Sequence, residues 1–150
     1  MGLLDRPEFD RWRAQAELTL ATAGMAARGG SHGWACFLCE QGAQLAVKGL
    51  LHAVGAEAWG HDLPQLVARA ARELDADWTS VADAADELSR HYIPARYPDA
   101  HPSGTPEDHY NPTSSGLAFG YASAVLAMVD STWVDLGRAD ADADDEVSDR

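Results

Sequence analysis

The fold is decided around a stretch that reads His91-Tyr92-Ile93-Pro94-Ala95-Arg96-Tyr97-Pro98-Asp99-Ala100-His101. Its two prolines forbid a continuing helix, because proline lacks a backbone N–H and pushes the residue before it out of the α region. The stretch therefore ends a strongly helical segment and is itself irregular. Side chains that bind or react are often found on such segments, and this one carries Arg96, Tyr97, Asp99 and His101.

Two long helices are predicted before this stretch. Apolar residues recur at three- and four-residue steps from Phe9 to Ala27, and Asp5 followed by Glu8 predicts a capping box at the start of that helix. A second helix is expected over residues 32–54, with Ser31 as its cap. Its apolar stripe is wider than a surface helix needs, so we expect it to be the central, most buried helix.

Three further helices complete the pattern. Asp62 predicts a capped helix over residues 63–74, and a fourth is expected from residue 75 to Tyr92. Asn111, followed by a proline, is an N-cap for a last helix that we expect to end by residue 137.

The chain shows no repeat and no strand pattern. Its 150 residues suit one domain. We therefore predict an all-α fold, a five-helix up-and-down bundle with a long loop before the last helix. The domain is expected to span residues 1–137. Residues 138–150 alternate Ala and Asp with almost nothing to bury, which indicates an acidic disordered tail.

The formal net charge is −13, so we expect only weak non-specific affinity for polyanions. Such affinity comes mainly from Lys and Arg side chains that contact phosphates. Any nucleic acid must then be held by a local site. No apolar run approaches the roughly 20 residues of a membrane span, and the N-terminus lacks the order of a signal peptide. We expect a cytoplasmic protein with no membrane contact.

Three blocks of sequence resemble a known family. They are Cys36-Phe37-Leu38-Cys39-Glu40-Gln41-Gly42-Ala43 with Lys48-Gly49-Leu50-Leu51, then Gly60-His61-Asp62-Leu63, then the stretch from Tyr92 to Ala100. Together they resemble the HEPN domain family, in the family's order and over roughly residues 5–136. The Arg-Tyr-Pro-Asp-Ala run is similar to that of one HEPN branch. The resemblance also implies a helical bundle.

The resemblance implies two activities. In many HEPN proteins an Arg followed by a His after four to six residues is the active motif of a metal-independent RNase, often the toxin of a toxin-antitoxin pair. Arg96 and His101 match that spacing, and the residues suit the chemistry, since imidazole moves protons near neutral pH and guanidinium holds phosphate charge. Here, however, Tyr97 and Pro98 follow the Arg. The branch with this signature is linked more with nucleotide binding.

The favoured function is therefore a nucleotide- or RNA-binding module that acts with a small nucleotidyltransferase partner and forms a homodimer. The alternatives are the endoribonuclease and a non-catalytic protein-interaction module. No metal or cofactor is implied. The predicted nucleotide-binding residues are Lys48, Gln44, Glu40, Arg96, Tyr97, Asp99 and Tyr110.

Several of these residues admit a structural interpretation as well. Glu40, Gln44 and Lys48 are spaced four apart on one helix face, which is either solvated or lines a groove with the Arg96 loop. Arg96 either contacts a ligand or has a structural role, through packing or through a salt bridge to Asp99. Tyr97 and Tyr110 either stack on a base or cover the end of the bundle.

Two further residue types have plainer interpretations. Cys36 and Cys39 have no second cysteine pair nearby in the sequence, which favours core packing over a metal or redox site. We expect His61 to be a loop residue or a capping partner.

Overall fold

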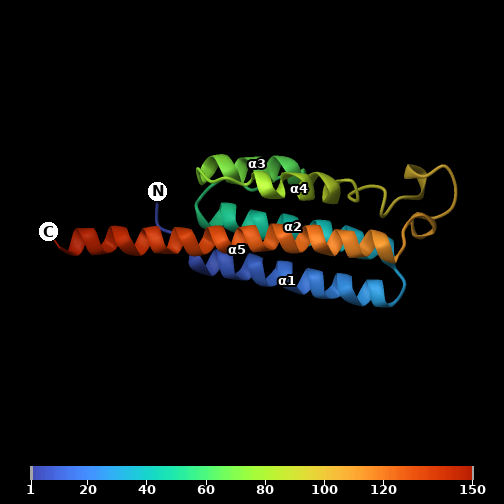
Figure 1. The fold of residues 1–150 in the computed structure, drawn as a ribbon, viewed down its shortest axis with the longest axis horizontal. Helices are drawn as coiled ribbons and strands as arrows, with labels where there is room; N and C mark the ends of the chain where they lie inside the picture. Colours follow the sequence, from blue (N-terminus) through green and yellow to red (C-terminus); the bar gives the residue numbers. More distant parts are fainter. Residues whose placement is uncertain (1, 150) are drawn as a thin grey trace.

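The computed structural model describes residues 2–149, and within them the regular secondary structure is entirely helical, as predicted. Figure 1 shows the arrangement of the elements. The α-helices are α1 (Arg6–Arg28), α2 (His32–Ala53), α3 (Leu63–Glu73), α4 (Ala82–Ser89) and α5 (Pro112–Ser148). Short 3-10 segments are η1 (Thr79–Val81), η2 (Pro98–Ala100) and η3 (Pro106–His109).

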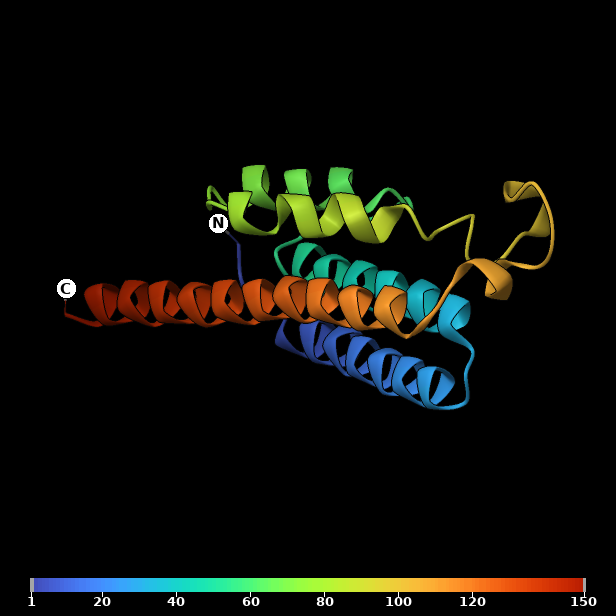
Figure 2. The same ribbon diagram turned by 45° about the vertical axis from the view of Figure 1, so that its right-hand side comes forward.

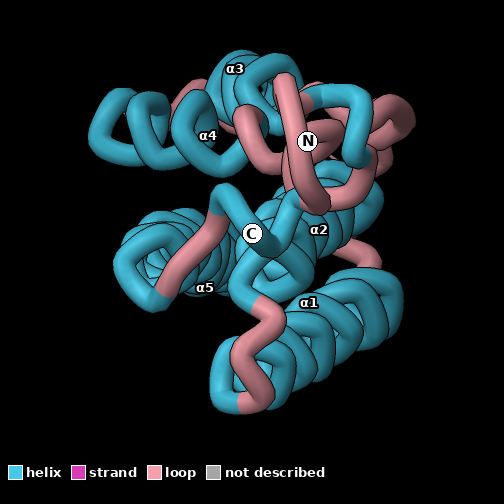
Figure 3. Tube along the Cα trace, turned by 90° about the vertical axis from the view of Figure 1, so that its right-hand side faces the viewer, coloured by secondary structure: helices cyan, strands magenta, loops and turns pink. Residues whose placement is uncertain are grey.

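The central helix is α2, which contacts α1, α5, α3 and α4. Seen end-on, it lies between α1 on one side and the α3–α4 pair on the other, with α5 beside it (Figure 3). Its sequence is apolar nearly all the way round, which is typical of a helix buried on every side. The fully buried side chains of α2 include Cys36, Cys39, Val47, Leu50 and Leu51. The prediction of a central buried helix is confirmed.

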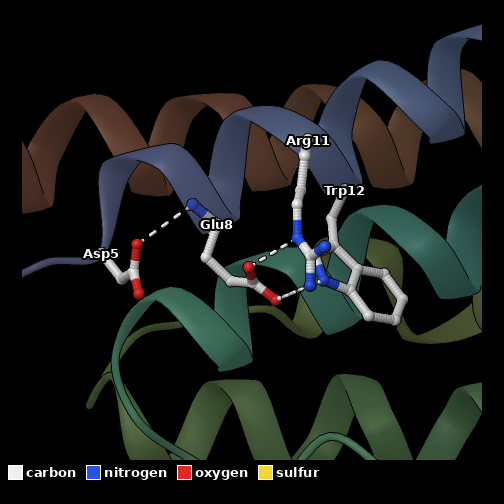
Figure 4. Close-up of polar contacts among 4 residues, drawn as sticks. All are labelled: Asp5, Glu8, Arg11 and Trp12. Carbon is white, nitrogen blue, oxygen red and sulfur yellow. Dashed lines mark hydrogen bonds and ion pairs between the residues drawn. The ribbon is translucent and has the colours of Figure 1, made fainter.

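The start of α1 is held by polar contacts that Figure 4 draws. Asp5 accepts a hydrogen bond from the Glu8 N–H at 3.1 Å, so the predicted N-cap is present. The reciprocal half of the capping box is not formed. The Glu8 carboxylate instead accepts from Arg11 at 2.6 Å and from the Trp12 indole at 2.8 Å, while the Asp5 N–H donates to the Ala53 carbonyl.

The start of α2 differs from the prediction. Ser31 makes no side-chain capping bond. The Trp34 N–H donates instead to the carboxylate of Glu107, at 3.2 Å, from η3 in the long loop. A negative charge is favourable at this position because the exposed N–H groups of a first turn carry partial positive charge.

Helix α4 is shorter than predicted and ends at Ser89 rather than at Tyr92. Residues 90–96 form turns. Pro94 has no N–H to donate to the carbonyl of Arg90 and disfavours the α conformation of Ile93, so the last predicted turn does not continue the helix.

Helix α5 is longer than predicted. The expected end at Gly137 was wrong, since the helix continues to Ser148 and projects past the bundle (Figure 2), so residues 138–148 are helical rather than disordered. Alanine is the best helix former, and no proline interrupts this part. Arg6 also pairs with Asp140 at 3.5 Å.

By length and composition alone, α5 is the one described helix apolar enough to cross a membrane. The core helix of a soluble protein has the same property, and α5 packs on α2 and α4.

Candidate functional site

The turns after α4 place Arg96 against α2. Its guanidinium carbon lies 4.4 Å from the ring centre of Phe37, 4.6 Å from that of Tyr92 and 5.0 Å from that of Tyr97. Arg96 Nε donates to the carbonyl of Tyr92 at 2.8 Å. A planar guanidinium stacks on aromatic faces, so these rings fix the position of the charge.

The two Nη groups of Arg96 have no hydrogen-bond or ion-pair partner within residues 2–149. In particular, the alternative ion pair with Asp99 is not formed among these residues. Asp99 is exposed on η2. The guanidinium is therefore held at one edge and keeps its other donors available for an anion.

Next to this arginine, the polar residues of α2 are mostly buried. Glu40 is 0% exposed and Gln44 is 2% exposed, so the solvated-face interpretation is wrong for both. The Glu40 carboxylate accepts hydrogen bonds from the side-chain amides of Gln44 and Gln41, the latter at 2.8 Å.

Burial dominates the electrostatics of this face. Desolvation raises the pKa of Glu40, although the hydrogen bonds from Gln44 and Gln41 and the positive charges of Lys48 and Arg96 act in the opposite direction. Desolvation also lowers the pKa of Lys48, against the attraction of Glu40. The charge of Arg96 favours the ionised form of Glu40, which is consistent with the Arg96 loop lying close to this face of α2.

The structure adds His61 to this site. The ring Nδ1 of His61 lies 3.3 Å from Gln44 Oε1, and the amide of Gln44 donates to the His61 carbonyl at 3.1 Å. The His61 ring stacks on Tyr92, with centroids 5.7 Å apart. The sequence interpretation of His61 as a loop or capping partner missed these contacts. The signal was available in Gln44, a polar side chain on an otherwise apolar helix.

An open hollow lies beside these contacts. Its volume is about 380 Å³, and His61, Asp62, Ser89 and Tyr92 line it. Asp62 also caps α3 by accepting from the Gln65 N–H at 3.2 Å, as predicted. We call this feature the His61 hollow.

His101 lies in the same loop but is engaged elsewhere. Its Nε2 donates to the carbonyl of Pro94 at 2.7 Å, since a carbonyl only accepts. Its ring stacks on His109, with centroids 4.2 Å apart. Within residues 2–149, no hydrogen bond or ring contact joins it to Arg96.

Tyr110 and Tyr97 have different surroundings. The Tyr110 hydroxyl is hydrogen-bonded to His91 Nδ1 at 3.1 Å, and burial raises the pKa of Tyr110 to about 12. Its ring packs against the hydrophobic core. Tyr97 is 47% exposed and contacts Arg96. The structure therefore brings Tyr97, but not Tyr110, into contact with Arg96.

The two cysteines are fully buried, as predicted. Desolvation raises the pKa of Cys36 and of Cys39 to about 12, which keeps both thiols protonated and unreactive. Among residues 2–149, no group of three His, Cys, Asp or Glu side chains is placed to hold a metal ion.

The family is shown by a sequence model of the HEPN domain, which matches residues 9–130. The chain belongs to the HEPN domain family. The matched residues include Glu40, Gln44, His61 and Arg96, and so cover the whole site.

Solved structures agree with this HEPN assignment. The crystal structure of TT1696 from Thermus thermophilus is 37% identical, with a TM-score of 0.78 over 83% of this chain and 97% of that one. ST0689, an archaeal HEPN homologue, is 31% identical, with a TM-score of 0.69 over 87% and 98% of the two chains. The HEPN domain protein TM0613 from Thermotoga maritima is 26% identical, with a TM-score of 0.66 over 83% and 98%. A search of curated proteins found no significant match.

Proposed function

We propose that this HEPN domain binds a nucleotide or single-stranded RNA, with Arg96 holding a phosphate group. The observation that carries the proposal is the guanidinium fixed by three aromatic rings with its two Nη groups unpartnered among the described residues. Arginine binds phosphate through two parallel N–H donors, and a guanidinium that is already in place loses little freedom on binding.

The surroundings of Arg96 suit the rest of a nucleotide. Tyr97 exposes nearly half of its surface beside the guanidinium, and an exposed aromatic face stacks on any base. Lys48 is half-buried and forms no ion pair within residues 2–149, so it adds positive charge on the same side of α2. These groups form the local site that a chain of net charge −13 requires to hold a polyanion.

Binding is favoured over cleavage by the surroundings of His101. A general base has to reach the 2′-hydroxyl of RNA with a free ring nitrogen. His101 donates its Nε2 proton to the Pro94 carbonyl and stacks on His109, so its free nitrogen is Nδ1. Among the described residues no contact pairs His101 with Arg96, so the two side chains do not form the joint site that cleavage would need. We therefore propose a binding module that acts with a nucleotidyltransferase partner, and make cleavage an outcome of the test.

The test measures fluorescence anisotropy of a labelled hexauridylate RNA at low salt in EDTA. We expect saturable binding by the native protein and about tenfold weaker binding by Arg96→Ala, the effect of one charge-assisted phosphate contact. Arg90→Ala is the matched control, because Arg90 is exposed and, among residues 2–149, forms an ion pair with Glu87 alone. Absent binding, or equal losses in both variants, would contradict the proposal.

The same mixtures are then run on a gel. We expect intact RNA throughout. Fragments with cyclic 2′,3′-phosphate ends that disappear with His101→Ala would replace the binding proposal by the endoribonuclease.

A further inference from the structure

The side-chain amide of Gln44 has only one orientation that satisfies its neighbours. Its NH₂ group donates to the Glu40 carboxylate and to the His61 carbonyl, and both of these groups only accept when Glu40 is ionised. Its Oε1 is therefore left facing His61 Nδ1. Because Glu40 and Gln44 are buried, this arrangement is shielded from water.

This orientation selects one form of the neutral His61 ring. Gln44 Oε1 only accepts, so Nδ1 of His61 must carry the proton. The other nitrogen, Nε2, is then a hydrogen-bond acceptor, and it has no partner within residues 2–149. The stack on Tyr92 fixes the plane of the ring at the wall of the His61 hollow.

Asp62 and Ser89, which also line the hollow, offer acceptors too. Asp62 uses only Oδ1 to cap α3, and Ser89 already donates its hydroxyl proton to the carbonyl of Asp86 at 2.9 Å. Three of the four lining residues therefore offer acceptors, whereas the Tyr92 hydroxyl can both donate and accept, so the hollow favours groups that donate. It disfavours a phosphate, which only accepts and is negatively charged like Asp62.

One aromatic ring connects the hollow to Arg96. Tyr92 lies 5.7 Å from the His61 ring centre and 4.6 Å from the guanidinium carbon of Arg96. A ligand that reaches both residues therefore needs an acceptor group for Arg96 and donor groups for His61. These groups have to lie a short distance apart in the ligand. A ribonucleotide, with its phosphate and its ribose hydroxyls, has this arrangement.

We infer that His61 and Asp62 recognise ribose hydroxyls, so that the site prefers ribonucleotides to deoxyribonucleotides. This inference rests on the proposed nucleotide binding at Arg96 and adds the sugar that the site selects. His61 contacts the ligand through Nε2. Glu40 and Gln44 are positioning residues, which hold the ring in the required form.

The test compares hexauridylate RNA with the hexadeoxyuridylate DNA of the same base, by anisotropy. The native protein should bind the RNA about threefold to tenfold more tightly, the range expected for one hydrogen bond. His61→Phe keeps an aromatic ring to stack on Tyr92 and should lose the preference. His52→Phe is the matched control, since His52 also packs on an aromatic ring, that of Trp12. Circular dichroism verifies that each variant is folded.

The outcomes separate the two proposals. If the native protein binds RNA and DNA equally and Arg96→Ala weakens both, nucleotide binding stands and ribose recognition is overturned. If the native protein binds neither, both fail. A measurement on the free protein adds an independent test, because ring nitrogen chemical shifts at about pH 8, where imidazole is neutral, should show the proton of His61 on Nδ1. A proton on Nε2 would overturn the inference whatever the binding result.

Discussion

Gly49 is a point at which α1 and α2 lie close together, and adding a methyl group there tests their packing. A Cβ at Gly49 would lie 2.6 Å from the Cβ of Trp12 and 3.7 Å from the carbonyl oxygen of Phe9. The Cβ of Trp12 is attached directly to the backbone and cannot rotate away. Gly49→Ala therefore forces α1 to move relative to α2.

The size of the effect follows from two opposing terms. Alanine gains about 1 kcal/mol over glycine in a helix interior, while overpacking a core contact costs about 1–3 kcal/mol. Since Trp12 cannot yield by a rotamer change, we expect Gly49→Ala to lose about 1–2 kcal/mol net. Gly120 in α5 is the control, because a Cβ there would meet nothing within 4 Å. Gly120→Ala should gain about 1 kcal/mol.

Urea denaturation of the native protein and both variants measures these free energies of unfolding. The midpoints should move in opposite directions with similar m-values, as expected when stability alone changes. Midpoints that move together, or a Gly49→Ala variant as stable as Gly120→Ala, would refute the close packing of α1 on α2.

Three other predictions test the site, a cap and the assembly. Burial raises the pKa of Glu40, so its contribution to stability is full below the unfolded pKa of about 4.3 and is lost as pH rises through the folded pKa. The stability of Glu40→Gln relative to the native protein should therefore rise between about pH 4 and pH 7 in urea titrations, and a flat difference would contradict this. Glu107→Ala should lower the free energy of unfolding by about 1 kcal/mol, because it removes the carboxylate that caps α2 at the Trp34 N–H. Ser31→Ala should change thermal stability little, since Ser31 makes no side-chain capping bond. A larger loss for Ser31→Ala than for Glu107→Ala would identify Ser31 as the cap. Sedimentation equilibrium should find a homodimer, against a chain mass of 16.1 kDa, and a monomer at all concentrations would reject the expected pairing.

The parts of the fold that sequence predicts are those set by local spacing. Asp5, Asp62 and Asn111 cap their helices through residues three positions away, so the pattern contains both partners. The cap of α2 depends on Glu107, 73 positions from Trp34. No local pattern indicates such a contact, and Ser31 was the natural local candidate.

The features of the site likewise divide into those set by local sequence spacing and those set by contacts between distant segments. The spacing of Glu40 and Gln44 placed them on one face, but their burial depends on how α3 and the Arg96 loop pack on α2. Arg96 was identified from its loop, whereas the contribution of Phe37 to its position comes from a helix far away in the sequence. His61 was missed because its function in the network depends on Gln44, 17 positions earlier.

The central claim, that the Arg96 site binds nucleotides, is tested most directly by NMR titration of the native protein with hexauridylate RNA. The signals of Arg96 Nε–H and of the Gln44 side-chain amide should shift and saturate together. The Nε–H signal of Arg13, which pairs with Asp130 between α1 and α5, should stay in place. Shifts centred on Arg13, or saturable binding that leaves Arg96 and Gln44 unmoved, would contradict the account.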